Sequence, residues 1–200
     1  MSLESFLPFA ILLGLLALLV IVFLYEWIYR FSERTAQDVI PYLRTINLEE
    51  VKTLFDLKTE KFLRLNSSPQ EFKRAQWKRC HLALQYIGDL AHNAKVFQEW
   101  GKYERTRSRR KLDRDARRTS LELTIACAQC RICSVAVRLR IHFWLIRMAI
   151  LPFAAIPSFA SLPRMGSVEM LSFYQQIKAS AIELGQAYGE SYHEKLVHSI

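Results

Sequence analysis

The stretch "TSLELTIACAQCRICSVAVRLRIHFWLIRMAI", residues 119–150, decides the fold of this 200-residue chain. Neither glycine nor proline occurs between residues 102 and 151, so a helix of about 35 residues can run unbroken up to Pro152. Its apolar residues recur at helical spacing, and strand-like alternation is nearly absent from the rest of the chain. The sequence therefore predicts an all-α domain built around one long helix.

Two apolar stripes lie on almost opposite sides of this helix. The first stripe consists of Leu123, Cys127, Cys130, Val137, Ile141, Trp144 and Met148. The second consists of Ile125, Ala128, Ile132, Val135, Leu139, Phe143, Ile146 and Ile150. Such a helix is either the central helix of a bundle, or it packs on the bundle with one side and on a bilayer surface with the other.

Cationic side chains separate the two stripes. Arg131, Arg138 and His142 lie on one flank, and Arg140 and Arg147 lie on the other. An arginine near the centre of a membrane helix costs about 2.5 to 3.5 kcal/mol on insertion scales. The long helix is therefore not expected to cross a membrane.

An earlier segment is expected to cross it instead. Residues 6–25, "FLPFAILLGLLALLVIVFLY", carry no charge, and twenty helical residues span a hydrocarbon core of about 30 Å. Glu4 stands where a cleaved signal peptide would have a basic leader, so the segment is expected to be retained. Arg30, Arg34 and Arg44 follow the apolar run and no Lys or Arg precedes it, which places the N-terminus outside and the body in the cytoplasm.

These features divide the chain into an anchor with a juxtamembrane helix, residues 1–33, and a bundle of four to five helices, residues 34–200. The membrane helix is expected to continue as far as Pro41, and Asn47 is expected to cap a helix over residues 48–65. Ser68, Pro69 and Glu71 form a capping box for a helix that runs to Gly101. A last helix starts at Ser167. The uncharged residues 148–162 are either buried or touch the bilayer.

A strongly basic segment precedes the long helix. Residues 102–118 hold nine basic residues against Glu104, Asp113 and Asp115. Its candidate contacts for anionic lipid or another polyanion are Arg105, Arg107, Arg109, Arg110, Lys111, Arg114, Arg117 and Arg118. The segment is either a solvated helix start, a lipid headgroup patch or a nucleic-acid contact. Few aromatic residues interleave the arginines, which favours lipid over nucleic acid.

Three cysteines, Cys127, Cys130 and Cys133, have a spacing that metal sites use. On a helix, however, Cys127 and Cys133 differ by about 9 Å along the axis, which is too far apart for one tetrahedral zinc. Cys127 and Cys130 fall on an apolar stripe, so they are interpreted as core residues. In a cytoplasmic body all four cysteines, Cys80 included, are expected to be free of disulfides.

Two acid–histidine pairs have the spacing of a di-metal carboxylate site. Asp89 with His92 and Glu190 with His193 stand one turn apart on different helices, with Glu122 and Glu49 or Glu50 at the same level of a bundle. These histidines are expected to lie opposite the apolar faces of their helices, so a surface position is favoured.

No phosphate-binding loop or nucleophile elbow occurs, so an enzyme is not supported and no cofactor is predicted. The sequence predicts a single-pass membrane protein whose body is a non-catalytic interaction or scaffold domain, with a basic segment facing anionic lipid or an unidentified protein partner. The alternatives are a membrane-tethered di-metal enzyme and a nucleic-acid tether.

Overall fold

A computed structural model describes residues 34–111, 113–150, 156–159 and 167–200. They belong to one compact unit, Arg34–Ile200. Regular structure in these residues is helical throughout, with no strand, which confirms the all-α prediction. The predicted membrane helix, residues 6–25, and its juxtamembrane extension up to residue 33 lie outside the described residues.

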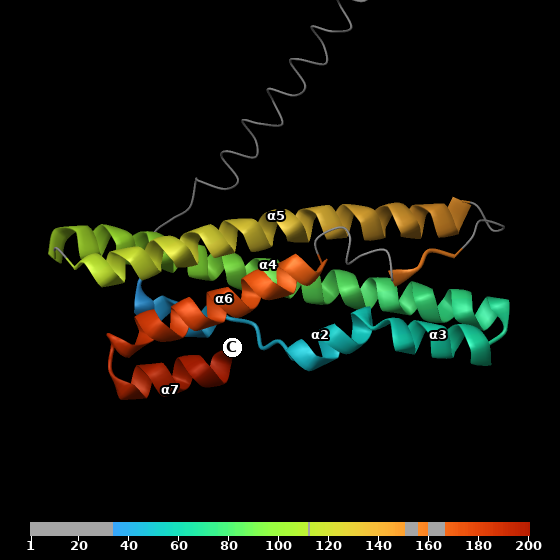
Figure 1. The fold of residues 1–200 in the computed structure, drawn as a ribbon, viewed down its shortest axis with the longest axis horizontal. Coiled ribbons are helices and arrows are strands. Elements are labelled where there is room, and N and C mark those ends of the chain that lie inside the picture. Colours follow the sequence, from blue (N-terminus) through green and yellow to red (C-terminus); the bar gives the residue numbers. More distant parts are fainter. Residues whose placement is uncertain (1–33, 112, 151–155, 160–166) are drawn as a thin grey trace, which may run out of the picture. The chain divides into compact units, whose positions relative to one another are not determined.

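Two long helices form the backbone of the domain. Helix α4 (Pro69–Lys111) and helix α5 (Arg114–Ile150) run antiparallel and pack along most of their lengths (Figure 1). Helix α6 (Ser167–Gln186) packs mainly on α5, and α7 (Glu190–Ser199) folds back beside α6. The short helices α2 (Leu48–Phe55) and α3 (Leu57–Asn66) contact α4. The core lies between the α4–α5 hairpin and these flanking helices.

The start of α4 is the capping box that the sequence predicts. The Ser68 amide donates to Glu71 Oε2 at 2.9 Å, and the Glu71 amide donates back to Ser68 Oγ at 3.4 Å. The predicted inner face is also confirmed, because the following six side chains are all buried: Phe72, Ala83, Ile87, Leu90, Ala94 and Phe97. Local sequence thus determines both where α4 begins and which side faces the core.

The predicted end of α4 at Gly101 is wrong, because the helix continues to Lys111. A Cβ at Gly101 would lie 2.9 Å from Thr124 Oγ1 and 3.3 Å from the Ser120 carbonyl oxygen. The glycine therefore permits a close approach of α4 to α5 and does not end the helix.

Residues 34–66 differ from two predictions. The membrane helix was expected to continue to Pro41, but Thr35 is extended and the chain then forms two single-turn 3-10 helices, Ala36–Asp38 and Ile40–Tyr42. The single helix expected over residues 48–65 is broken at Asp56, whose extended backbone ends α2 and whose side chain accepts the Lys58 amide at 3.1 Å. Acceptance of an N-terminal amide by a carboxylate starts a new helix there.

The C-terminal helix is also divided in two. A turn at residues 187–189 separates α6 from α7, and Gly189 adopts a φ of +95°, which glycine tolerates without strain. Gly185 lets α7 approach, since a Cβ there would lie 2.8 Å from Leu196 Cδ2. The described residues therefore contain six α-helices, where four to five were predicted, because two expected helices are each broken once.

Residues 34–47 form a strap that crosses α4. The Arg34 side chain donates from Nε to Glu99 Oε2 at 2.8 Å. Further along, the Arg44 amide donates to Asn93 Oδ1 at 2.9 Å, and Asn93 Nδ2 donates to the Arg44 carbonyl at 2.7 Å. Glu99 and Asn93 are both buried, so the strap is fixed to the core at two points.

Candidate functional site

The two apolar stripes of α5 have different environments. Every residue of the first stripe, from Leu123 to Met148, is buried against the neighbouring helices. The second side is open: Leu139 is 65% exposed and Phe143 is 56% exposed. The seven large exposed side chains of this side, called here the α5 ridge, are Leu121, Ile125, Ile132, Leu139, Phe143, Ile146 and Ile150. The central-helix arrangement is therefore wrong, because α5 packs on the bundle with one side only.

Cations flank the ridge on both sides. Arg138 and Arg140 are exposed and Arg147 is half-buried. Arg140 holds its guanidinium 5.8 Å from the centre of the Trp144 ring. Between Leu123 and Ile150 the sequence contains four arginines and no acidic residue. An apolar stripe with basic flanks is the pattern of a helix that lies on an anionic surface.

Arg131 does not belong to this cationic border, although the sequence placed it there. Its side chain is buried and donates to Gln98 Oε1 at 2.7 Å. Burial lowers the pKa of Arg131 to about 10, opposed by the nearby Cys127 and Glu99. Arg131 thus joins α5 to α4 inside the domain.

The basic segment lies at the turn between α4 and α5. The Asp113 amide donates to the Ser108 carbonyl at 3.2 Å, and Asp113 Oδ1 accepts the Ala116 amide at 3.1 Å, so this acid starts α5. Five of the eight predicted contacts have exposed side chains: Arg105, Arg109, Arg114, Arg117 and Arg118. The side chains of Arg110 and Lys111 lie outside the described part of the chain. The turn lies at one end of the α4–α5 hairpin (Figure 1), and these exposed arginines form a cluster on its two sides.

Arg107 is 35% exposed and is held against the domain surface by its neighbours, so it is not part of the fully exposed cluster. Its guanidinium donates to the Tyr188 hydroxyl and lies 3.6 Å from Glu104 Oε2. Glu104 is buried and also accepts Trp100 Nε1 at 3.1 Å. Burial, together with the hydrogen bond to the Glu104 carboxylate, raises the pKa of Tyr188. Arg107 therefore ties α4 to the C-terminal hairpin.

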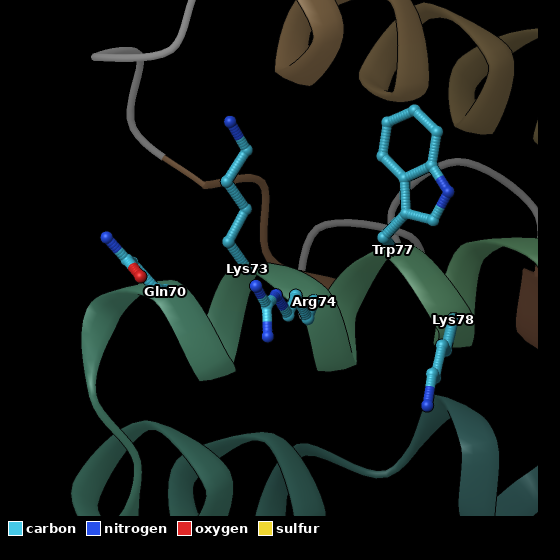
Figure 2. Close-up of a pocket in the computed structure, with 5 residues that line it drawn as sticks. All are labelled: Gln70, Lys73, Arg74, Trp77 and Lys78. Carbon is cyan, nitrogen blue, oxygen red and sulfur yellow. The ribbon is translucent and has the colours of Figure 1, made fainter.

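A second cationic surface occurs near the start of α4. A shallow groove of about 450 Å³ is lined by Gln70, Lys73, Arg74, Trp77 and Lys78. Figure 2 shows Lys73 and Trp77 extending to one side of α4 and Lys78 extending to the opposite side. The groove is open and its cations diverge, so it lacks the convergent polar groups of a small-molecule site.

Helix α5 is long enough and apolar enough to cross a membrane. Among the described residues it is the one helix that meets both conditions. However, 44% of its apolar window is buried inside the domain. The buried side packs lengthwise on α4 and α6, which carry polar outer faces. A helix packed in this way is also typical of a domain core.

The cysteines occupy core positions on this helix and on α4. Cys80, Cys127 and Cys130 are buried, and Cys133 is half-buried. Cys130 Sγ lies 3.8 Å from the Met170 carbonyl oxygen, to which the thiol donates. Burial raises the pKa of Cys80 and Cys130 to about 12, and raises that of Cys127 as well.

Thiol reactivity is a direct test of this arrangement. At pH 8 we expect an aromatic disulfide reagent to modify Cys133 first and to leave Cys80, Cys127 and Cys130 unmodified until the domain unfolds, because only a thiolate attacks and burial suppresses its formation. Mass spectrometry of time points assigns each site, and Cys133→Ala serves as the control. Fast modification of Cys127 in the folded protein would contradict the core assignment.

The acid–histidine pairs do not converge. Asp89 pairs with Arg44 at 2.6 Å, and Nε2 of His92 lies 3.0 Å from the Tyr42 carbonyl oxygen, so both contact the strap. Within the described ranges no group of three or more His, Cys, Asp or Glu side chains is arranged to hold a metal ion. The geometry offers no support for the di-metal alternative.

Comparison with known proteins adds no relative. No protein-family model matches the chain, and neither a curated protein nor a solved structure resembles it significantly. The functional argument therefore rests on the two surfaces that the domain presents, the arginine cluster at the α4–α5 turn and the α5 ridge.

Proposed function

We propose that this protein is a membrane-anchored, non-catalytic interaction protein whose helical domain binds anionic lipid through the arginine cluster at the α4–α5 turn. The observation that carries the proposal is the gathering of five exposed arginines at one turn, from Arg105 on α4 to Arg118 on α5. Clusters of four to eight basic residues near a membrane bind anionic headgroups, at about 1 kcal/mol for each residue close to the surface.

The rest of the chain supports this assignment. The uncharged residues 6–25 are long enough to anchor the protein, and they precede the domain by fewer than ten residues. With a net charge of +9 the chain favours anionic partners in general. The domain would therefore stand close to a bilayer and be attracted to its negatively charged leaflet.

Nucleic acid is the alternative anionic partner. Single-stranded nucleic acid is bound by aromatic side chains that stack on bases within a basic groove. The exposed arginines at the turn are not interleaved with aromatic residues, and the one nearby tyrosine that Arg107 contacts, Tyr188, is held by Glu104. Lipid is therefore the better match for this cluster.

Vesicle binding by residues 34–200 tests the proposal, because the apolar run at residues 6–25 would itself enter any vesicle. We expect binding to vesicles with anionic lipid and little binding to vesicles of phosphatidylcholine alone. Changing Arg109, Arg114 and Arg117 to glutamine is expected to weaken binding about 100-fold, from about 1 kcal/mol for each charge.

A charge-matched control separates a local site from net charge. Changing Lys58, Lys61 and Lys195 to glutamine removes the same three charges from exposed positions on α3 and α7. Equal losses from both triple variants would contradict a specific site at the turn. A single-stranded oligonucleotide that displaces the domain from anionic vesicles at low concentration would favour the nucleic-acid alternative.

A further inference from the structure

Three arginines of the cluster, Arg114, Arg117 and Arg118, lie on the same face of α5 as the α5 ridge. Helical residues are separated by about 100° around the axis, which places Arg114, Arg117 and Arg118 within about 60° of the direction of Leu139. All three are exposed. The face of α5 that begins with arginines therefore continues, without a break in direction, into the apolar ridge from Leu121 to Ile150.

We propose that this whole face of α5 lies flat in the headgroup region of an anionic bilayer, with the ridge buried among the upper acyl chains. The inference rests on the proposed function for bringing the domain to an anionic membrane, and it adds a second, apolar contact. The ridge extends about 43 Å from Leu121 to Ile150, at about 1.5 Å per residue. Interfacial helices bury such a face about 5 to 10 Å deep.

The border of the ridge suits a lipid surface. Arg138 and Arg140 are exposed and project to opposite sides of the ridge at about 100° from Leu139. Long arginine side chains can keep their aliphatic stems against acyl chains while the guanidinium reaches a phosphate. With no acidic residue between Leu123 and Ile150, nothing along this stretch repels an anionic headgroup.

A second copy of the chain fits the α5 ridge less well than a lipid surface does. An antiparallel pair of α5 helices in contact along the ridge would place Arg138, Arg140 and Arg147 of both copies along one interface. The one acidic side chain within the span of the ridge, Glu122, is already paired with Arg118 at 2.9 Å. Like charges along a helix pair oppose association, and complementary pairs normally specify it.

Insertion of α5 across the bilayer is also disfavoured. The opposite side of the helix is occupied by the bundle, where Cys130 contacts the Met170 carbonyl and Arg131 contacts Gln98. Crossing would separate α5 from α4 and α6 and expose Arg131 and Arg138 to hydrocarbon. Lying on the surface leaves every packed contact in place.

Fluorescent probes on the full-length chain test the inference. The chain, in a Cys133→Ala background, is reconstituted into anionic vesicles, and an environment-sensitive dye is attached through Ile132→Cys on the ridge, Arg109→Cys at the turn or Leu65→Cys on α3. Leu65 is the matched control, since it is an apolar residue that is 85% exposed and lies on another helix. Acyl-brominated lipid serves as the quencher.

We expect the probe at Ile132 to emit at shorter wavelength than the probe at Leu65, and to be quenched several times more strongly by brominated lipid. The double variant Leu139→Gln with Phe143→Gln should reduce this quenching. The matched double variant Leu82→Gln with Phe62→Gln, which changes exposed residues on α4 and α3, should not. Equal thermal unfolding of both variants shows that the domain remains folded.

The other outcomes are distinguishable. If the probe at Ile132 stays in water while the probe at Arg109 reports headgroup contact, the ridge inference fails and the proposed function stands. If both probes stay in water, both fail. If the probe at Ile132 is shielded from water but brominated lipid does not quench it, protein covers the ridge, and the inference is overturned in favour of a second copy or another segment of the chain.

Discussion

Replacing Phe159 by alanine is expected to lower the free energy of unfolding by about 3 to 5 kcal/mol, the range for deleting a fully buried aromatic ring. Phe159 lies in the segment that joins α5 to α6 and is completely buried. Its ring centre is 5.7 Å from that of Trp144 and 6.0 Å from that of Phe55. The change would leave a cavity between α2, α5 and this connecting segment.

The polar contacts around Phe159 explain why the cavity cannot collapse. Its amide donates to the buried Glu60 at 2.8 Å, and the Arg79 guanidinium lies 4.7 Å from its ring centre. Gln76 Nε2 donates to the Pro157 carbonyl at 3.0 Å. These bonds fix the backbone of residues 157–159, so it cannot move in to fill the space, and an incompletely relaxed cavity costs more.

Phe143 provides the matched control for this measurement. It is a phenylalanine on the ridge, 56% exposed, and Phe143→Ala is expected to change stability by no more than about 0.5 kcal/mol. Denaturant unfolding of residues 34–200, followed by circular dichroism, gives both values. A Phe159→Ala cost no larger than that of Phe143→Ala would mean that the connecting segment does not dock on the bundle.

Replacing Trp100 by alanine is expected to have an effect of the same size, about 3 to 5 kcal/mol. Trp100 is completely buried, and its ring lies 6.3 Å from that of Tyr188 and 6.4 Å from that of Tyr192. The change also removes the Nε1 donor of the buried Glu104. It therefore creates a cavity and weakens the polar network that holds the turn between α6 and α7 against α4.

Trp77→Ala is the control for Trp100→Ala, because Trp77 lies on the same helix and is 36% exposed. We expect Trp77→Ala to lower the free energy of unfolding markedly less than Trp100→Ala does. The Trp100 variant should also show a local effect: proteolysis after Tyr188 should accelerate before global unfolding, since α7 loses the ring contact between Tyr192 and Trp100. Equal unfolding free energies for the two tryptophan variants would contradict the assignment of Trp100 to the core.

Several parts of the fold could be predicted because they depend on neighbours in sequence. The capping box at Ser68 and Glu71 needs only four residues, and the inner face of α4 follows from helical spacing. The breaks at Asp56 and at residues 187–189 were missed, because the apolar helix pattern continues across both and outweighed the local signals of Asp56 as a cap and Gly189 as a turn residue. The sequence allows residues 148–162 to meet either the core or the bilayer; Met148 and Phe159 are buried in the bundle, whereas Ile150 is 69% exposed on the ridge.

The candidate site also combines features that the sequence predicts with features that depend on the tertiary structure. The sequence by itself determined that nine basic residues cluster in residues 102–118 and that α5 has two apolar faces, because composition and periodicity are local properties. Only the tertiary structure decided which face is buried, that Arg131 is buried against Gln98, that Arg107 is bonded to Tyr188, and that Gly101 permits close packing. Periodicity specifies which side chains share a face, but what that face meets depends on the position of helices distant in sequence.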